Sequence, residues 1–137
     1  MTPSIDDPLN WQSRPLLWRH FRCPVGAGGL VDASVTGASS SAADDSSVEV
    51  QLKVENTPNG PIIIGAAFLA DGGVAVIAAA SWVCDALISS QQSLAHVSAS
   101  DLGRQLQLAL ELKPVERAAA LLVEDALAKA LEGALVS

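Results

Sequence analysis

The chain has 137 residues, the size of one domain that is large enough to bury a hydrophobic core. Half of its residues are apolar and only 4% are aromatic, so the core is expected to consist mainly of aliphatic side chains. The formal net charge is −7 and the eight basic residues form no run, which argues against a nucleic-acid-binding surface.

The most apolar segment, residues 61–88, is too fragmented to cross a membrane. Residues 71–73 (Asp-Gly-Gly) divide it into pieces of ten and fifteen residues, whereas a spanning helix needs about 20. The N-terminus carries Asp6 and Asp7 and lacks the basic start and apolar centre of a signal peptide. We therefore expect a cytoplasmic protein that does not associate with membranes.

The N-terminal residues differ in composition from the rest. Residues 1–15 are expected to form a loosely ordered arm, and residues 16–137 a single domain. The two cysteines, Cys23 and Cys84, are expected to remain reduced, because a chain without an export signal does not usually form disulfides.

The domain is predicted to begin with a short helix and a strand. Residues 16–21 favour the helix, which ends before Pro24 and the glycines that follow it. Residues 30–37 (LVDASVTG) favour the strand, and the polar run 38–47 is typical of a surface loop.

Two further strands are predicted to form a hairpin. Residues 48–54 (VEVQLKV) alternate between apolar and polar side chains, as in a half-buried antiparallel strand. The Asn59-Gly60 step supplies the positive φ that a tight turn needs. The next strand, 61–70, is expected to carry on one face Ile62, Ile64, Ala66 and Phe68.

The second half of the chain is predicted to be helical. Residues 74–89 are rich in small apolar side chains and too long for a strand, which favours a buried helix. Ser98 or Ser100 is expected to cap the next helix, and Pro114 to lie in the first turn of the last one. Because strands precede helices, the sequence predicts an α+β domain with two layers, in which helices pack on one face of a small, about three-stranded antiparallel sheet.

Three motifs follow one another in an order that resembles a known family. The stretch RHFRCPVGAGGL contains a His-aromatic-x-x-Pro-x-x-x-Gly pattern at His20, Phe21, Pro24 and Gly28. A strand, a polar loop and a hairpin come next, and the last helix keeps Pro114, Val115, Leu122, Glu124, Asp125 and Ala126. This arrangement resembles the iron–sulfur cluster scaffolds of the IscU and NifU N-terminal type, which share their fold with the SufE sulfur-acceptor proteins. The resemblance covers residues 17–135 and implies a SufE/NifU fold.

The resemblance also implies where cluster ligands would stand. Such scaffolds hold a cluster with cysteine thiolates from three loops, assisted by an aspartate and sometimes a histidine. The corresponding positions in this chain are residues 40–44, Ser46, Gly73, Ala118 and Ala119. None of them is a cysteine, and Gly73 and Ala119 cannot ligate. The nearest metal-binding substitutes are Asp44 and Asp45, which could hold a hard cation such as Fe²⁺.

The resulting functional expectation is a ligand-depleted relative of the scaffolds. We expect no enzymatic activity and no stable cofactor, with action through partners such as a cysteine desulfurase or a true scaffold. The alternative is a weak iron-binding or iron-delivery protein that uses Asp44 and Asp45. Residues 112–115 match the family's chaperone-docking segment, although Lys113 replaces a proline and Glu116 a basic residue.

Other candidate chemistry has less support. His20 has no second ligand at a metal-binding spacing except Cys23. A sulfur-transfer role for Cys23 competes with the simpler interpretation of a surface thiol, with Cys84 as a small core residue. Residues 39–41 are serines without a His or Asp partner at a recognisable spacing, so nucleophilic catalysis is not indicated.

Overall fold

The structure is a computed structural model and describes residues 13–43 and 45–136. Its elements, in chain order, are α1 (Pro15–Arg22), β1 (Val35–Ser40), β2 (Ser47–Thr57), β3 (Gly60–Asp71), α2 (Val74–Ser90), the 3₁₀ turn η1 (Leu94–His96), α3 (Ala99–Ala109), the 3₁₀ turn η2 (Pro114–Glu116) and α4 (Arg117–Val136). Within the described part of the chain, no helix is long and apolar enough to cross a membrane.

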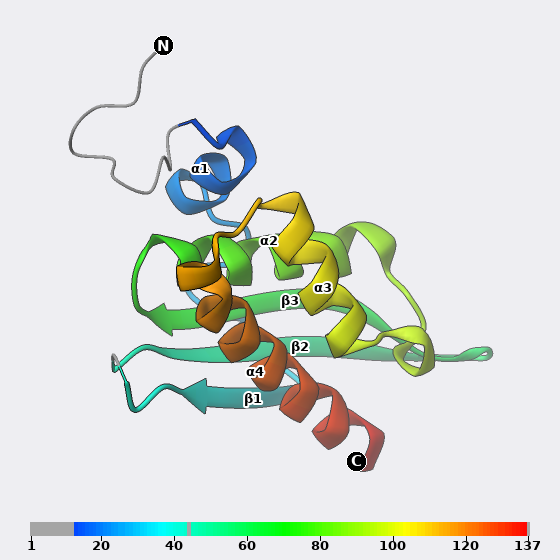
Figure 1. The fold of residues 1–137 in the computed structure, drawn as a ribbon. Coiled ribbons are helices and arrows are strands. Elements are labelled where there is room, and N and C mark those ends of the chain that lie inside the picture. Colours follow the sequence, from blue (N-terminus) through cyan, green and yellow to red (C-terminus); the bar gives the residue numbers. More distant parts are fainter. Residues whose placement is uncertain (1–12, 44, 137) are drawn as a thin grey trace.

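The elements form the two layers that the sequence predicts. The three strands make one antiparallel sheet in the order β1-β2-β3. Helix α4 packs on β1 and β2, and α2 packs on β3 (Figure 1). Helix α1 packs on α2, while α3 packs on α4. The α+β class and the three-stranded sheet are therefore confirmed.

The first strand lies further along the chain than the sequence predicts. It spans Val35–Ser40, whereas residues 31–32 form a turn. The polar residues 38–40, expected in a loop, pair with residues 47–49 of β2. Backbone pairing with a strongly apolar neighbour places these residues in the sheet, although their own side chains carry no alternating pattern. Only residues 41–46 remain as the connection.

The prediction of which side chains of the third strand face the core is correct only for the second half of that strand. Val54 pairs with Ile63 and Lys53 with Gly65, so Ile64 is an extra residue in a β-bulge. The bulge reverses the alternation, and Ile63 is fully buried in place of its two neighbours. A period-two pattern cannot reveal such an insertion, because both phases of an all-isoleucine run look apolar.

The predicted helices are present with nearly the expected bounds. Helix α2 begins at Val74, directly after the Asp-Gly-Gly step. Ser98 caps α3 by accepting a hydrogen bond from the Asp101 N–H at 3.2 Å, so the first of the two proposed serines is the cap. Pro114 opens the 3₁₀ turn that leads into α4.

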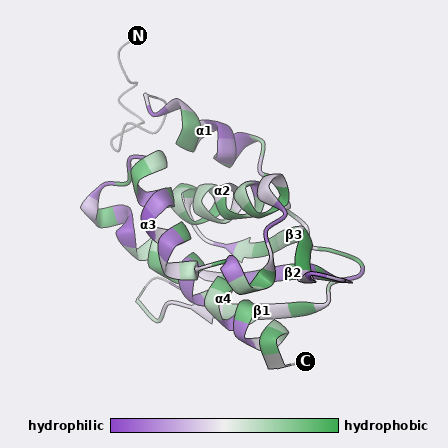
Figure 2. Ribbon diagram, turned by 90° about the vertical axis from the view of Figure 1, so that its right-hand side faces the viewer, coloured by the Kyte–Doolittle hydropathy of each residue, from purple (hydrophilic) through white to green (hydrophobic). Residues whose placement is uncertain are grey.

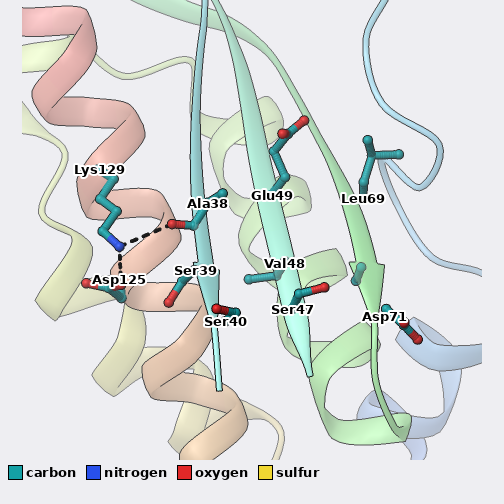
Figure 3. A pocket seen from close by; sticks show the side chains of 11 residues that line it. Ala38, Ser39, Ser40, Ser47, Val48, Glu49, Leu69, Asp71, Asp125 and Lys129 are labelled. Carbon is teal, nitrogen blue, oxygen red and sulfur yellow. Dashed lines mark hydrogen bonds and ion pairs between the residues drawn. The ribbon is translucent and has the colours of Figure 1, made fainter. Parts of the chain in front are cut away.

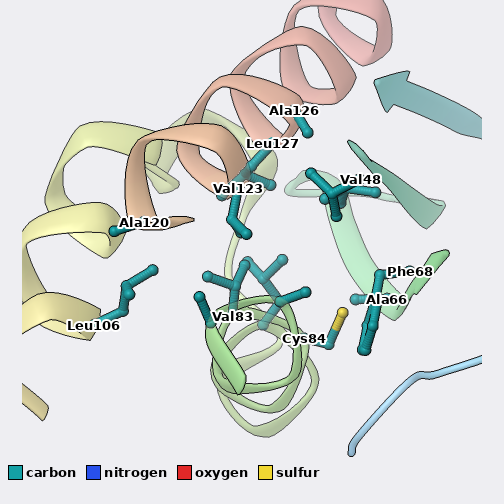
Figure 4. Packing of buried hydrophobic residues seen from close by; sticks show 14 of the residues in the cluster. Val48, Ala66, Phe68, Val83, Cys84, Leu106, Ala120, Val123, Ala126 and Leu127 are labelled. Carbon is teal, nitrogen blue, oxygen red and sulfur yellow. The ribbon is translucent and has the colours of Figure 1, made fainter. Parts of the chain in front are cut away.

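The core lies between the sheet and the two central helices. Figure 4 shows side chains from both layers meeting there, among them Val48 and Phe68 from the sheet, Val83 from α2, and Val123 and Leu127 from α4. All five are at most 3% exposed. In Figure 2, α2 is coloured mainly as hydrophobic along its length, whereas α3 carries both hydrophilic and hydrophobic residues. Helix α2 is thus the buried element that the sequence indicates.

The approach of α4 to β1 depends on a glycine. A Cβ atom at Gly37 would overlap the Ala126 carbonyl oxygen and the Ala130 amide nitrogen. The backbones of strand and helix therefore meet directly, and the small side chains along this side of α4 allow it. This contact fixes the middle of α4 against the middle of β1.

Candidate functional site

The ligand positions implied by the resemblance come together in space. Residues from the loop after β1, from the start of α2 and from the start of α4 line one cavity of about 190 Å³. Its lining residues are Ser41, Ser46, Gly73, Val74, Ala75, Val76, Val115, Glu116, Ala118, Ala119 and Leu122. We call this space the corner cavity. Segments more than 70 residues apart in the sequence thus meet where a scaffold would hold its cluster.

The local backbone explains the convergence. The loop closes on itself, because the Ser41 N–H donates to the Ser46 carbonyl oxygen at 2.8 Å. Gly72 must remain small, since a Cβ there would lie 3.1 Å from the Ser46 Oγ and 3.2 Å from Val76. Gly73 is the N-cap of α2 in extended conformation, with φ −81° and ψ −171°, and open space surrounds its Cβ position.

The walls of the corner cavity are mainly apolar. Val74, Val76 and Leu122 supply branched side chains, and Ser41 and Ser46 supply hydroxyl groups. Val115 stands at the rim and is 73% exposed. Glu116 is the one charged residue among the lining residues.

The carboxylate of Glu116 is already engaged. It accepts two hydrogen bonds from Arg14, to Nη1 at 2.6 Å and to Nη2 at 2.8 Å, and a third from the Lys113 N–H at 2.9 Å. Arg14 also donates to the Glu111 carbonyl oxygen at 2.8 Å. Both charged residues are buried. Arg14 lies within the stretch expected to be a loose arm, so the folded part begins slightly before residue 16; residues 1–12 of that arm lie outside the described residues.

These residues do not fit an iron–sulfur cluster. Iron in such a cluster is held by thiolates, sometimes with imidazole or carboxylate. Gly73, Ala118 and Ala119 offer no donor side chain, and the Ser41 and Ser46 hydroxyls are neutral hard oxygens. Within residues 13–43 and 45–136, no group of three or more His, Cys, Asp or Glu side chains is placed to hold a metal ion.

The proposed carboxylate ligands are only partly visible. Asp44 lies outside the described residues. Asp45 is exposed in the loop beside the corner cavity and has a positive φ of 58°. Asp45 is not among the residues that line the cavity.

Neither cysteine contributes to the corner cavity. Both are free thiols, and neither lines the cavity. Cys23 is exposed at the end of α1, as expected for a surface thiol. Cys84 is fully buried in α2. Burial, assisted by the neighbouring charge of Asp85, raises the pKa of the Cys84 thiol to about 12, so this thiol is inert at neutral pH.

The histidine of the N-terminal signature is a structural residue. His20 is 2% exposed, and its Nδ1 lies 2.7 Å from the Ser81 Oγ. The same Oγ accepts a hydrogen bond from the Val25 N–H at 2.8 Å, which ties α1 and the following loop to α2. Burial, reinforced by the charge of Arg19 and opposed by Asp85, holds the pKa of His20 below its usual value of 6.5.

The glycines after the signature let the chain run along the edge of β3. The Phe68 N–H donates to the Gly26 carbonyl oxygen at 2.8 Å, and the Gly28 N–H donates to the Phe68 carbonyl oxygen at 3.1 Å. Gly26 has φ +83°, and a Cβ there would press on the backbone of residues 66–67. The RHFRCPVGAGGL stretch is therefore a strap that covers a sheet edge, rather than a ligand-binding loop.

A second, larger cavity is lined by residues of all three strands and of α4, where sequence patterns give no signal. It measures about 650 Å³, is open and is partly lined by serine and acidic side chains. The Lys129 Nζ contacts the Asp125 carboxylate at 3.0 Å and donates to the Ala38 carbonyl oxygen at 3.2 Å (Figure 3). Hydrogen bonds from Ser39 and Lys129 lower the pKa of Asp125. The Lys129 ammonium group thereby provides a hydrogen-bond donor to a backbone carbonyl group of the edge strand β1.

Comparison with solved structures defines the fold. A nitrogen-fixing NifU-like protein (N-terminal part) from Brucella abortus aligns over 93% of this chain and 94% of its own, with 18% identity and a TM-score of 0.68. The chain has the NifU-like fold. A protein of unassigned function aligns over 90% of this chain and 98% of its own, with 20% identity and a TM-score of 0.64.

A third structure has the same fold. A candidate iron–sulfur cluster assembly scaffold for the SUF system from the thermophile Fervidobacterium islandicum AW-1 aligns over 85% of this chain and 94% of its own. Its identity is 11% and its TM-score 0.63. No protein-family model matches the sequence, and no curated protein is significantly similar to it. The expected SufE/NifU-type fold is therefore confirmed by structural comparison and not by sequence similarity.

Proposed function

We propose that this protein acts in iron–sulfur cluster assembly through protein partners and does not itself hold a stable cluster. The observation that carries the proposal is the corner cavity: Ser41, Gly73 and Ala119 line it together, yet none of them offers a thiolate, and its one charged lining residue, Glu116, is held in an ion pair with Arg14. The fold supports the place in assembly, because two structures with the same fold are described as NifU-like and as a candidate SUF scaffold. The proposal assigns no catalytic step to the chain.

The surface near the corner cavity supports action through partners. Val115 at the rim and Leu121 on α4 are 73% and 56% exposed. Exposed branched side chains beside an apolar hollow are typical of protein-binding sites. The net charge of −7 favours a partner with a basic docking face, such as a cysteine desulfurase or a cluster-bearing scaffold.

Anaerobic reconstitution with iron and sulfide tests the first half of the proposal. The purified chain is expected to show no charge-transfer absorption after desalting, whereas a thiolate-bearing NifU-like domain treated in parallel should show it. A stable cluster on this chain would overturn the proposal. For the second half, the chain expressed at native level should co-purify with a desulfurase or scaffold, and failure to do so would count against partner action.

Iron delivery remains the second candidate function, favoured by the exposure of Asp45 beside the corner cavity. Two carboxylates are few for tight binding of a hard cation, so the affinity for Fe²⁺ is expected to be weak. Anaerobic Fe²⁺ titration followed by calorimetry should be compared with an Asp44→Ala/Asp45→Ala variant. Binding that survives this double substitution, or no binding at all, would remove the carrier function.

A further inference from the structure

The two edges of the sheet are covered differently. Along β3, the strap forms two backbone hydrogen bonds with Phe68, and Ile62 forms an isolated bridge with Ser93. Strand β1 forms the other edge (Figure 1). In the described part of the chain, no strand or bridge lies on the outer side of β1. An edge of this kind offers its backbone groups to another strand.

Every second residue of β1 directs its backbone groups outward. The Ser41 N–H donates to the carbonyl oxygen of Ser46, so residue 41 faces β2. Because bonded and non-bonded pairs alternate along an antiparallel ladder, the even-numbered residues of β1 face away from β2. The Ala38 carbonyl oxygen agrees with this orientation, since it accepts its hydrogen bond from Lys129 on the outer side. The outward-facing residues are Thr36, Ala38 and Ser40.

These outward-facing residues are complementary to a second copy of themselves. When two copies of β1 pair antiparallel about a two-fold axis at Ala38, Ala38 lies opposite Ala38, and Thr36 lies opposite Ser40 of the second copy. Every outward N–H then meets an outward carbonyl group. The facing side chains are small and uncharged, and Thr–Ser pairs across strands are favourable. Because the axis is normal to the sheet, both helical layers lie on the same side.

Lys129 blocks this pairing at its centre. The Lys129 Nζ lies 3.2 Å from the Ala38 carbonyl oxygen and 3.0 Å from the Asp125 carboxylate (Figure 3). The Ser39 hydroxyl forms a hydrogen bond with the same carboxylate. In a dimer, the blocked carbonyl groups would lie beside the axis, and the two ammonium groups would repel each other there. Lysine side chains on strand edges prevent edge-to-edge association in this way.

We infer that the outer edge of β1 is a pairing surface for a second copy of this chain, and that the Asp125–Lys129 ion pair keeps it closed. The side chains of this pair are 52% and 53% exposed, so Lys129 can turn into solvent without loss of buried contacts. Pairing would join two three-stranded sheets into one. The surface shares no residue with the lining of the corner cavity, so the inference is independent of the proposed function.

Sedimentation equilibrium of the full chain tests the inference. The native chain is expected to be monomeric at every concentration. Lys129→Ala frees the Ala38 carbonyl oxygen and removes the charge from the axis, so its average mass should rise with concentration toward that of two chains. The matched control is Lys53→Ala, which removes the same charge from an exposed ion pair with Asp32 and should remain monomeric.

Two charge variants in the Lys129→Ala background test the register. Thr36→Lys/Ser40→Lys places lysine opposite lysine in the paired strands and should abolish the dimer. Thr36→Lys/Ser40→Glu places lysine opposite glutamate at the same two positions and should retain it. Both positions are exposed in the monomer, so neither variant disturbs the core.

The inference fails if Lys129→Ala remains monomeric at every concentration, or if Lys53→Ala associates to the same extent. It also fails if the two charge variants behave alike, since association would then use another surface. A dimeric native chain would show that the ion pair does not close the edge. If Lys129→Ala does not fold by circular dichroism, Lys129→Met, which keeps an aliphatic chain and lacks the ammonium group, provides the same test.

Discussion

Arg14 and Glu116 join the first described residues of the chain to the start of α4 through a buried bidentate ion pair, across 102 positions of sequence. The Lys113 N–H donates a third hydrogen bond to the same carboxylate. Glu116 also lines the corner cavity. This ion pair therefore holds Arg14, near the start of the described chain, against a residue that lines the corner cavity.

Breaking this pair should destabilise the protein strongly. Glu116→Ala leaves the buried Arg14 guanidinium without its counter-charge, which costs about 3–5 kcal/mol of unfolding free energy. An Arg14→Met/Glu116→Leu double variant should recover much of this loss, because no charge then remains buried. Urea unfolding of the three proteins measures the difference. Equal stability of Glu116→Ala and the native chain would show that the pair is solvated rather than buried.

Gly37 should tolerate no side chain. Gly37→Ala places a methyl group into the backbone of α4 at Ala126 and Ala130, and the helix must move away from β1. Overpacking of this kind costs about 1–3 kcal/mol. The matched control is Gly133→Ala in α4 itself, where the nearest atom to the added Cβ is the Val35 Cγ2 at 3.9 Å, an ordinary contact. Thermal melts should separate the two variants, and a similar melting temperature for both would contradict the close approach.

Helices and the hairpin were predictable from the sequence, whereas the site was predictable only in part. Local signals fix the helices: Ser98 caps α3 and Pro114 opens the turn before α4. The extent of β1 is determined by its pairing with β2, because residues 38–40 carry no strand pattern of their own. The bulge at Ile64 is likewise invisible in a run of isoleucines.

The resemblance to scaffolds identified the positions that converge, but not what they form. That Gly73 and Ala119 lie together follows from the fold. That the space between them remains a cavity depends on how the neighbouring side chains pack, which periodicity does not encode. The ion pair of Arg14 with Glu116 cannot be predicted for the same reason, since nothing local to either residue indicates a partner so distant in sequence.

Stability should decrease as the pH falls through the usual pKa of histidine. The folded-state pKa of His20 is depressed, so the folded chain holds its imidazole neutral while the unfolded chain takes up a proton below 6.5. Stability from this group is therefore fully present above 6.5 and decreases below it, by up to about 1.4 kcal/mol per pH unit. Urea midpoints across this range should show the slope. His20→Gln should flatten it, and an unchanged slope in that variant would assign the effect to other groups.

Restoring thiolates at the converging positions should create a cluster site. Gly73→Cys meets open space, and Ala119→Cys adds a sulfur atom toward the corner cavity. Together with Ser41→Cys, these changes provide three thiolates around one cavity, the donor type that iron–sulfur clusters require. After anaerobic reconstitution, the triple variant should show charge-transfer absorption and retain iron through desalting. A control with Thr36→Cys, Ser90→Cys and Ala128→Cys carries the same number of thiols on scattered elements, and it should remain colourless. Cluster binding by the control as well would mean that the fold does not direct ligands to this corner.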